Sequence, residues 1–144
     1  MKKISVLFVC LGNICRSPAA EAIFIGLLEK KRLTDAFVVD SAGTGSWHIG
    51  KKADTRMRIA AERRNINILS RSRQITSKDF QEFNYILAMD DSNFRNIQDL
   101  KNRTSSTDFA SIKKIQDFRS VFNEQEDPDP YFGGDEGFDY VLIF

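Results

Sequence analysis

The chain has 144 residues, 42% of them hydrophobic, and a formal net charge of +1 at pH 7. This length and composition predict one globular domain over residues 1–144 with a substantial core, and leave no room for a second domain. The near-neutral charge excludes a general attraction to nucleic acid or to a membrane surface.

Segments that would direct the chain to a membrane or out of the cell are not expected. No stretch reaches the roughly 18 apolar residues of a membrane span, and MKKISVLFVC is too short for a signal peptide. We therefore expect a cytoplasmic protein without membrane insertion. Its two cysteines, Cys10 and Cys15, are too few for a secreted disulfide framework, and such a pair is more often catalytic, redox-active or metal-binding.

The first predicted elements are a strand and a helix. Residues 4–9 form a continuous apolar run rich in β-branched side chains, which is typical of a strand buried on both faces of a parallel sheet. A helix should follow at once, because Pro18 suits a first helical turn and apolar residues recur at helical spacing up to the basic cluster at 30–32.

Further strands and helices alternate downstream. Strands are predicted at 37–39, 85–89 and 112–118, and helical segments from Asp54 to about residue 64, around Phe80 and Phe83, and from the MDDSN segment onward. This alternation predicts an α/β fold with a doubly wound, four-stranded parallel sheet and flanking helices. Ligands of such folds bind at the carboxyl ends of the strands, where residues 10–17 lie.

The junction VCLGNICRSP suits a phosphate better than a metal. A structural zinc site needs four ligands, whereas the chain has two Cys and one His. A loop that enters a helix N-terminus aims backbone N–H groups and the helix dipole at an anion. Gly12 and Asn13 tolerate the positive φ of such a loop, and the planar fork of Arg16 could bind two phosphate oxygens.

The same electrostatic field favours the thiolate of Cys10, a candidate nucleophile that Ser17 could support with a hydrogen bond. The expected reaction is in-line attack on a phosphoryl group, followed by hydrolysis of a phosphocysteine. An acid must protonate the leaving group. The carboxylates of DPDPYFGG are favoured over the lone His48, because acidic neighbours help keep a proton on Asp129. A solvated acidic loop is the alternative interpretation of that segment.

The chain resembles the low-molecular-weight protein tyrosine phosphatases. The resemblance rests on VLFVCLGNICRSPAAEAIF, DSAGTGSWHIG, RQIT, YILAMDDSN and DPDPYFGGDEGFDYVL, which occur in the family's order and cover most of the chain. It implies a flavodoxin-like fold and a phosphotyrosine phosphatase that uses no metal and no cofactor. It also implies a tyrosine-phosphorylated protein or peptide as substrate, and a monomer is favoured.

The resemblance also implies roles for individual residues. Cys10 would be the nucleophile, Arg16 the phosphate clamp and Asp129 the general acid and then base. Asn13, Ser17 and Ser41 would hold the loop in shape, while Trp47, Tyr131 and Phe132 would wall the substrate cleft. The phosphate-binding loop would comprise Leu11, Gly12, Asn13, Ile14, Cys15, Arg16 and Ser17. Cys15 has two interpretations: a small packed residue, or a redox partner that captures oxidised Cys10 as a disulfide.

Departures from the family pattern define the alternatives. Arginine-phosphate phosphatases of this fold typically carry Thr at the position of Ile14, so Ile14 favours phosphotyrosine. Related arsenate reductases need further cysteines, and this chain has none after Cys15. The last helix is expected to be short, which leaves open a phosphoprotein-binding module with impaired catalysis.

Overall fold

The computed structural model describes residues 2–104 and 110–118. Its centre is a parallel sheet of four strands in the order β2-β1-β3-β4. The strands are β1 (Ile4–Cys10), β2 (Phe37–Gly43), β3 (Tyr85–Ala88) and β4 (Ser111–Lys114). This is the strand order of a flavodoxin-like fold: β2 is added on one side of β1, and β3 and β4 are then added on the other side. The order of strands thus reverses between β1 and β3.

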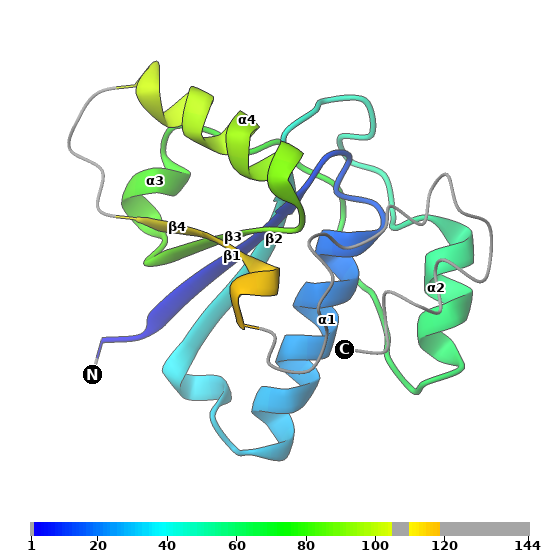
Figure 1. Cartoon of the computed structure of the whole chain (residues 1–144). Coiled ribbons are helices and arrows are strands. Elements are labelled where there is room, and N and C mark those ends of the chain that lie inside the picture. The colour runs from blue at the N-terminus through cyan, green and yellow to red at the C-terminus, as the bar shows by residue number, and fades with distance from the viewer. Residues whose placement is uncertain (1, 105–109, 119–144) are drawn as a thin grey trace.

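Helices cover both faces of this sheet (Figure 1). Helix α1 (Arg16–Lys30) lies on one face, with α2 (Thr55–Glu62) beside it, whereas α3 (Asp79–Glu82) and α4 (Asp91–Asn102) lie on the other. Two short 3-10 helices, η1 (Thr34–Ala36) and η2 (Ile115–Phe118), complete the described elements. Among the described residues, no helix combines the length and apolar character needed to cross a membrane.

Strand β1 is buried on both faces, as the apolar run predicts. Leu7 and Val9 belong to a core cluster with Phe80 and Ile97 from the α3 and α4 side. Phe8 points the other way, where its ring meets Phe24 of α1 edge to face at 5.8 Å between centroids. Because strand side chains alternate between faces, β1 joins both layers and fixes its own carboxyl end at the centre of the molecule.

Most predicted elements are confirmed, with differences at their ends. Helix α1 begins two residues before Pro18, β2 continues to Gly43, and the side chain of Asp54 caps α2 by accepting the N–H of Arg56. The strand predicted at 112–118 is wrong in its second half, because residues 115–118 form η2. There the carboxylate of Asp117 accepts the backbone N–H of Lys114, and pairing with β3 ends at Lys114.

Candidate active site

The segment 11–15 connects the carboxyl end of β1 to the first turn of α1. It therefore lies at the edge of the sheet and beside the point where the strand order changes direction (Figure 1). This is the position where open parallel sheets bind their ligands. Both Cys10 and Arg16, the residues that flank the segment, are buried.

The carbonyl groups of this loop are turned outward to donors from other segments. Four such bonds occur: Thr44 N–H to Cys10, Gly45 N–H to Leu11, the Ser72 hydroxyl to Gly12, and Asp54 N–H to Ile14, with lengths of 2.9, 2.8, 2.9 and 2.7 Å. In a trans peptide the C=O and the following N–H point in opposite directions. The N–H groups of the residues that follow these carbonyls therefore point to the inside of the loop.

The thiol of Cys10 lies at this inner side. The backbone N–H of Asn13 donates to its Sγ at 3.2 Å, which agrees with the inward direction of that peptide. The Oγ of Ser17 is 3.0 Å from the same sulfur. Converging N–H dipoles and the N-terminus of α1 favour negative charge at this point, whether on the sulfur or on a bound anion.

Asn13 holds the loop in its shape. Its φ is +57°, in the left-handed region that asparagine tolerates better than most residues. Its side-chain Nδ2 donates to Ser17 Oγ at 2.8 Å, and its Oδ1 accepts the backbone N–H of Arg73 at 2.9 Å. The structure thus brings Asn13, Ser17 and Cys10 into one hydrogen-bonded group.

Arg16 is held by a carboxylate that the sequence interpretation missed. Its Nη1 donates to Oδ2 of Asp90 at 2.8 Å, and only 3% of the Arg16 side chain is exposed. Asp90 also caps α4 by accepting the N–H of Asn93 at 2.7 Å. Because Asp90 lies two residues after the end of β3 at Ala88, it lies at the same sheet edge as the loop, and this position could have identified it.

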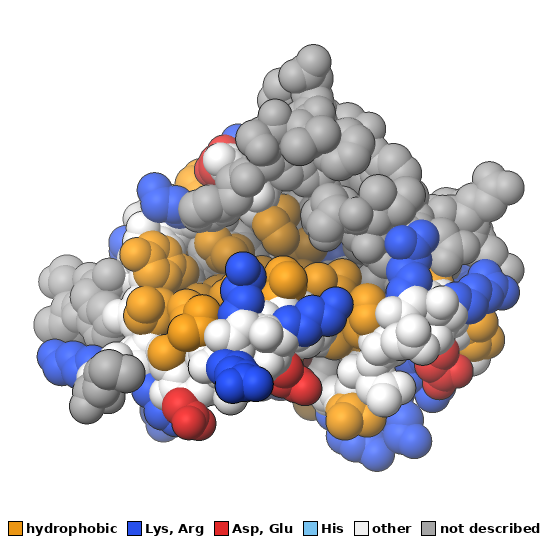
Figure 2. Space-filling model, turned by 90° about the horizontal axis from the view of Figure 1, so that it is seen from below, with side chains coloured by type: hydrophobic (Ala, Val, Ile, Leu, Met, Phe, Trp, Pro, Cys, Tyr) orange, Lys and Arg blue, Asp and Glu red, His pale blue; other side chains and the backbone are white. Residues whose placement is uncertain are grey.

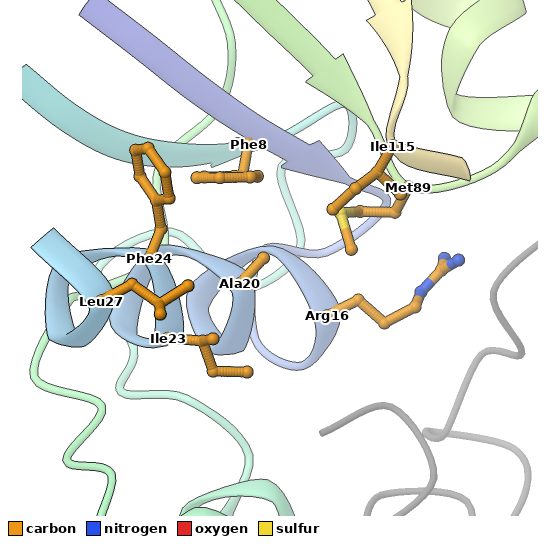
Figure 3. Close-up of a pocket in the computed structure, with 8 residues that line it drawn as sticks. All are labelled: Phe8, Arg16, Ala20, Ile23, Phe24, Leu27, Met89 and Ile115. Carbon is orange, nitrogen blue, oxygen red and sulfur yellow. The ribbon is translucent and has the colours of Figure 1, made fainter. Parts of the chain in front are cut away.

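Arg16 lines a cavity together with apolar side chains. Figure 3 shows the side chain of Arg16 leaving the first turn of α1 and passing beside Met89 and Ile115, with Phe24 and Leu27 farther along the helix. These residues line a cavity of about 130 Å³. Because only 3% of the side chain is exposed, the interaction of the guanidinium with Asp90 is stronger than it would be in water. On the underside of the molecule, hydrophobic side chains also reach the surface among lysine and arginine side chains (Figure 2).

Ser41 lies in β2 and bonds two carboxylates. Its hydroxyl donates to Oε1 of Glu21 in α1, and its backbone N–H donates to the carboxylate of Asp40. Burial raises the pKa of Glu21; the Ser41 hydrogen bond opposes this effect, and the negative charge of Asp40 adds to it. The described contacts of Ser41 are thus to Glu21 and Asp40, and a role in shaping the loop stays a prediction.

Gly43 is a further residue that the sequence interpretation did not assign. A Cβ built at this position would lie 2.7 Å from the carbonyl oxygen of Leu11 and 3.1 Å from the backbone nitrogen of Asn13. Both atoms are backbone and cannot turn away as a flexible side chain would. The end of β2 can therefore approach the loop this closely only because residue 43 is glycine.

Trp47 lies on the surface beside the loop, where 66% of it is exposed. Its ring passes over Gly45 and lines a cavity of about 300 Å³ together with Leu11. The imidazole of His48 lies near Gly12, since its Cδ2 would be 3.0 Å from a Cβ at that glycine. An aromatic wall at the mouth of the loop is thus compatible with the position of Trp47.

Ile14 and Cys15 point away from the loop into a second cluster with Met57 and Ala60 of α2. Cys10 and Cys15 are both buried thiols. Packing accounts for Cys15, and its predicted redox role is not tested by this contact. The other predicted residues, Asp129, Tyr131 and Phe132, lie outside the described residues. Within the described ranges, no group of three or more His, Cys, Asp or Glu side chains is placed to hold a metal ion.

Comparison with known proteins decides the family. A family model described as low molecular weight phosphotyrosine protein phosphatase matches residues 5–143. The chain belongs to this family of hydrolases.

Relatives in the family are similar over nearly the whole chain. The low molecular weight phosphotyrosine protein phosphatase of Schizosaccharomyces pombe is 43% identical over 138 residues, which are 95% of this chain and 86% of the relative. The human protein of the same name is 42% identical, with 95% of this chain and 85% of the relative covered.

Solved structures of family members share the fold. A protein tyrosine phosphatase from Entamoeba histolytica, crystallised with Hepes in the active site, superposes with a TM-score of 0.90 at 44% identity. That match covers 97% of this chain and 88% of the other. The drosophila arginine phosphatase also superposes with a TM-score of 0.90, at 34% identity, over 99% of this chain and 89% of the other. The family fold thus carries proteins named for two different phosphorylated substrates.

Proposed function

We propose that the chain hydrolyses phosphotyrosine in proteins or peptides through a phosphocysteine on Cys10. The observation that carries the proposal is the position of the Cys10 sulfur, which lies 3.2 Å from the Asn13 N–H and 3.0 Å from the Ser17 hydroxyl, inside a loop of inward N–H groups. A phosphate in this loop would place its phosphorus next to the sulfur. The names of the family relatives support tyrosine as the alcohol.

In the first step the thiolate of Cys10 attacks phosphorus in line with the bond to the tyrosine oxygen. A sulfur–phosphorus bond forms as the phosphorus–oxygen bond breaks, and Asp129 gives its proton to the departing phenolate oxygen. The loop N–H groups and the guanidinium of Arg16 bind the equatorial oxygens, where negative charge must be stabilised. Asp90 limits the rotation of that guanidinium before substrate arrives.

In the second step a water molecule attacks phosphorus on the side opposite the sulfur. Asp129, now a carboxylate, takes the proton of the water, and the Cys10 thiolate leaves as the sulfur–phosphorus bond breaks. The hydroxyl of Ser17 stabilises the departing sulfur, because it lies within hydrogen-bond distance of it. Trp47, Tyr131 and Phe132 are proposed to hold the substrate ring beside the loop.

The mechanism is tested with p-nitrophenyl phosphate and a phosphotyrosine peptide. Cys10→Ser should abolish turnover of both substrates while it retains binding of the peptide. Asp129→Ala should slow hydrolysis of the peptide, which has a poor leaving group, much more than hydrolysis of p-nitrophenyl phosphate. Substantial turnover by Cys10→Ser would disprove the phosphocysteine, and an equal loss on both substrates would assign the acid to another residue.

A second candidate substrate is phosphoarginine, which the likeness to the drosophila arginine phosphatase favours. The identity of residue 14 opposes it, because arginine-phosphate phosphatases of this fold typically carry Thr at this position and the chain carries the bulkier Ile14. Comparison of kcat/KM on phosphoarginine and phosphotyrosine peptides separates the two substrates. Preference for phosphotyrosine by wild type, and a relative gain on phosphoarginine in Ile14→Thr, would support the leading proposal. Peptide binding without phosphate release by wild type would instead indicate a binding module.

A further inference from the structure

The side chain of Arg73 joins two carboxylates from different elements. Its Nε donates to Asp40 of β2 at 3.0 Å, while Nη1 and Nη2 donate to the two oxygens of Asp79 at 3.1 and 3.0 Å. Asp79 is the first residue of α3, and its side chain is only 4% exposed. Burial lowers the pKa of Arg73, but its interactions with Asp79 and Asp40 outweigh burial and raise this pKa above its ordinary value. The guanidinium is thus a charged clamp with three hydrogen bonds to the two carboxylates.

The backbone of the same residue lies between β2 and the Cys10 loop. The carbonyl oxygen of Arg73 accepts the N–H of Gly43 at 2.8 Å, and its N–H donates to Oδ1 of Asn13 at 2.9 Å. The ion pairs of Arg73 with Asp40 and Asp79 therefore fix the position of its backbone N–H, which donates to the loop.

This N–H determines which way the Asn13 amide faces. A donor requires the amide oxygen, so Oδ1 must face Arg73 and Nδ2 must face Ser17. Nδ2 then donates to Ser17 Oγ, so the hydroxyl hydrogen of Ser17 must be donated to an acceptor other than Asn13. Its acceptors are the sulfur of Cys10 at 3.0 Å and the carbonyl of Ala42 at 3.4 Å, of which the sulfur is nearer.

The reverse orientation would have the opposite effect on the nucleophile. If the Asn13 amide turned, its oxygen would face Ser17 Oγ and accept the hydroxyl hydrogen itself. Cys10 would then lose the Ser17 donor that stabilises its thiolate. The direction of one side-chain amide thus decides whether Ser17 donates to the sulfur or to Asn13.

We propose that Arg73 is a positioning residue for Cys10: its ion pairs with Asp40 and Asp79 hold the N–H that orients the Asn13 amide and thereby directs the Ser17 hydroxyl to the sulfur. The proposal deepens the phosphatase function proposed above and rests on Cys10 as its nucleophile. Arg73 acts on the protonation of the Cys10 sulfur through Asn13 and Ser17 and makes no direct contact with substrate.

The test is the pH dependence of Cys10 alkylation by iodoacetamide in Arg73→Met. We expect the pH midpoint of alkylation to rise by about one unit, so that the thiolate fraction below the midpoint falls about tenfold. On p-nitrophenyl phosphate, kcat should fall more than KM rises. Arg71→Met is the matched control, because it removes the same charge from the same segment, where Arg71 is exposed and bonds the Gly50 carbonyl. It should leave the midpoint unchanged, and an equal shift in both variants would overturn the proposal.

A second variant, Asn13→Gly, distinguishes an effect of Arg73 through the Asn13 amide from a general loss of structure. Asn13→Gly keeps the positive φ and deletes the amide. Arg73→Met should therefore add no further shift in Asn13→Gly, and a full additional shift there would overturn the proposal. Arg73→Lys keeps the positive charge and loses the planar fork. Restoration of the wild-type midpoint by lysine would assign the effect to charge alone and would also overturn it.

Folding and substrate identity are controlled independently. Thermal unfolding and near-UV circular dichroism check each variant. If Arg73→Met does not fold, Asp40→Asn removes one arm of the clamp, and it should shift the midpoint in the same direction; no shift there would refute the proposal. Alkylation needs no turnover, so a wild-type protein inactive on phosphotyrosine would refute the proposed function while this shift would still support the role of Arg73.

Discussion

Gly43 offers the most direct test of how the nucleophile loop keeps its shape. In Gly43→Ala the new Cβ would lie 2.7 Å from the Leu11 carbonyl oxygen and 3.1 Å from the carbonyl carbon of Gly12. An ordinary contact begins near 3.4 Å, so the loop and the end of β2 must separate by about 0.7 Å. Side-chain rotation cannot relieve this contact, because the three atoms nearest to the Cβ are all main chain.

The displacement should weaken both catalysis and folding. A misplacement of about 1 Å in a catalytic constellation can lower the rate about 100-fold, so we expect kcat/KM on p-nitrophenyl phosphate to fall by a factor of about 10 to 100. The inhibition constant for inorganic phosphate should rise by a similar factor, because the N–H groups of the loop would no longer converge. Overpacking should also lower the free energy of unfolding by about 1–3 kcal/mol.

A glycine elsewhere in the chain supplies the control. Gly26 lies in α1, and a Cβ at this position would meet no atom within 4 Å. Gly26→Ala should therefore keep full activity and raise the free energy of unfolding by about 1 kcal/mol, since alanine favours a helix more than glycine does. If Gly43→Ala retained wild-type kcat/KM and phosphate inhibition, the close approach of β2 would not determine the shape of the loop, and this reasoning would be refuted.

Three further predictions concern neighbours of the loop. Asp90→Asn should keep the cap of α4 but remove the carboxylate that pairs with Arg16. The free energy of unfolding should therefore drop by roughly 3 kcal/mol, and inorganic phosphate should inhibit more weakly. Unchanged values in denaturation and inhibition assays would contradict this. Glu21 has a raised pKa and so holds more protons in the folded than in the unfolded state. Wild type should therefore lose stability relative to Glu21→Gln as pH rises from the ordinary glutamate pKa to the raised one, and a constant difference in denaturant titrations would argue against it. Peroxide should oxidise Cys10 to a sulfenic acid that the thiol of Cys15 converts to a disulfide with loss of water. In Cys15→Ser a second equivalent of peroxide should oxidise the sulfenic acid to a sulfinic acid, so after excess peroxide a thiol reductant should restore the activity of wild type and not of Cys15→Ser. Equal recovery would exclude a protective role.

The parts of the site that could be predicted are those written in one continuous segment. The apolar run, Gly12, Asn13 and Pro18 indicate a strand, a loop with positive φ and a helix in immediate succession. Local geometry follows from such signals, and the structure has φ of +57° at Asn13. The expectation of a positive φ at Gly12 was wrong, because only Asn13 of the two adopts it. The position of Cys10 at the sheet edge could also be predicted, because it comes at the end of a buried strand typical of a parallel sheet.

The residues that sequence reasoning missed act across long separations. Ser72 and Arg73 each bond a loop residue that precedes them by 60 positions, and Asp90 reaches Arg16 across 74. Such pairings depend on the order of strands in the sheet, which a single sequence indicates only through resemblance. Gly43 was missed for a similar reason: its requirement for glycine comes from the loop of β1, and the residues beside it in the chain give no sign of it.

Asp40 and Ser41 are neighbours in β2 and contact different elements. Neighbouring strand residues point to opposite faces, so Asp40 meets Arg73 on one face while Ser41 meets Glu21 of α1 on the other. Asp40 bonds Arg73, whose N–H donates to Asn13, and Gly43 approaches the backbone of Leu11 directly, so both residues of β2 are connected to the loop. Its carbonyl groups are held by residues near 44, 54 and 72, which belong to three separate segments. The inward N–H groups that suit a phosphate thus depend on the tertiary fold as a whole, and substitutions that loosen any one of these segments should impair phosphate binding before they abolish the sheet.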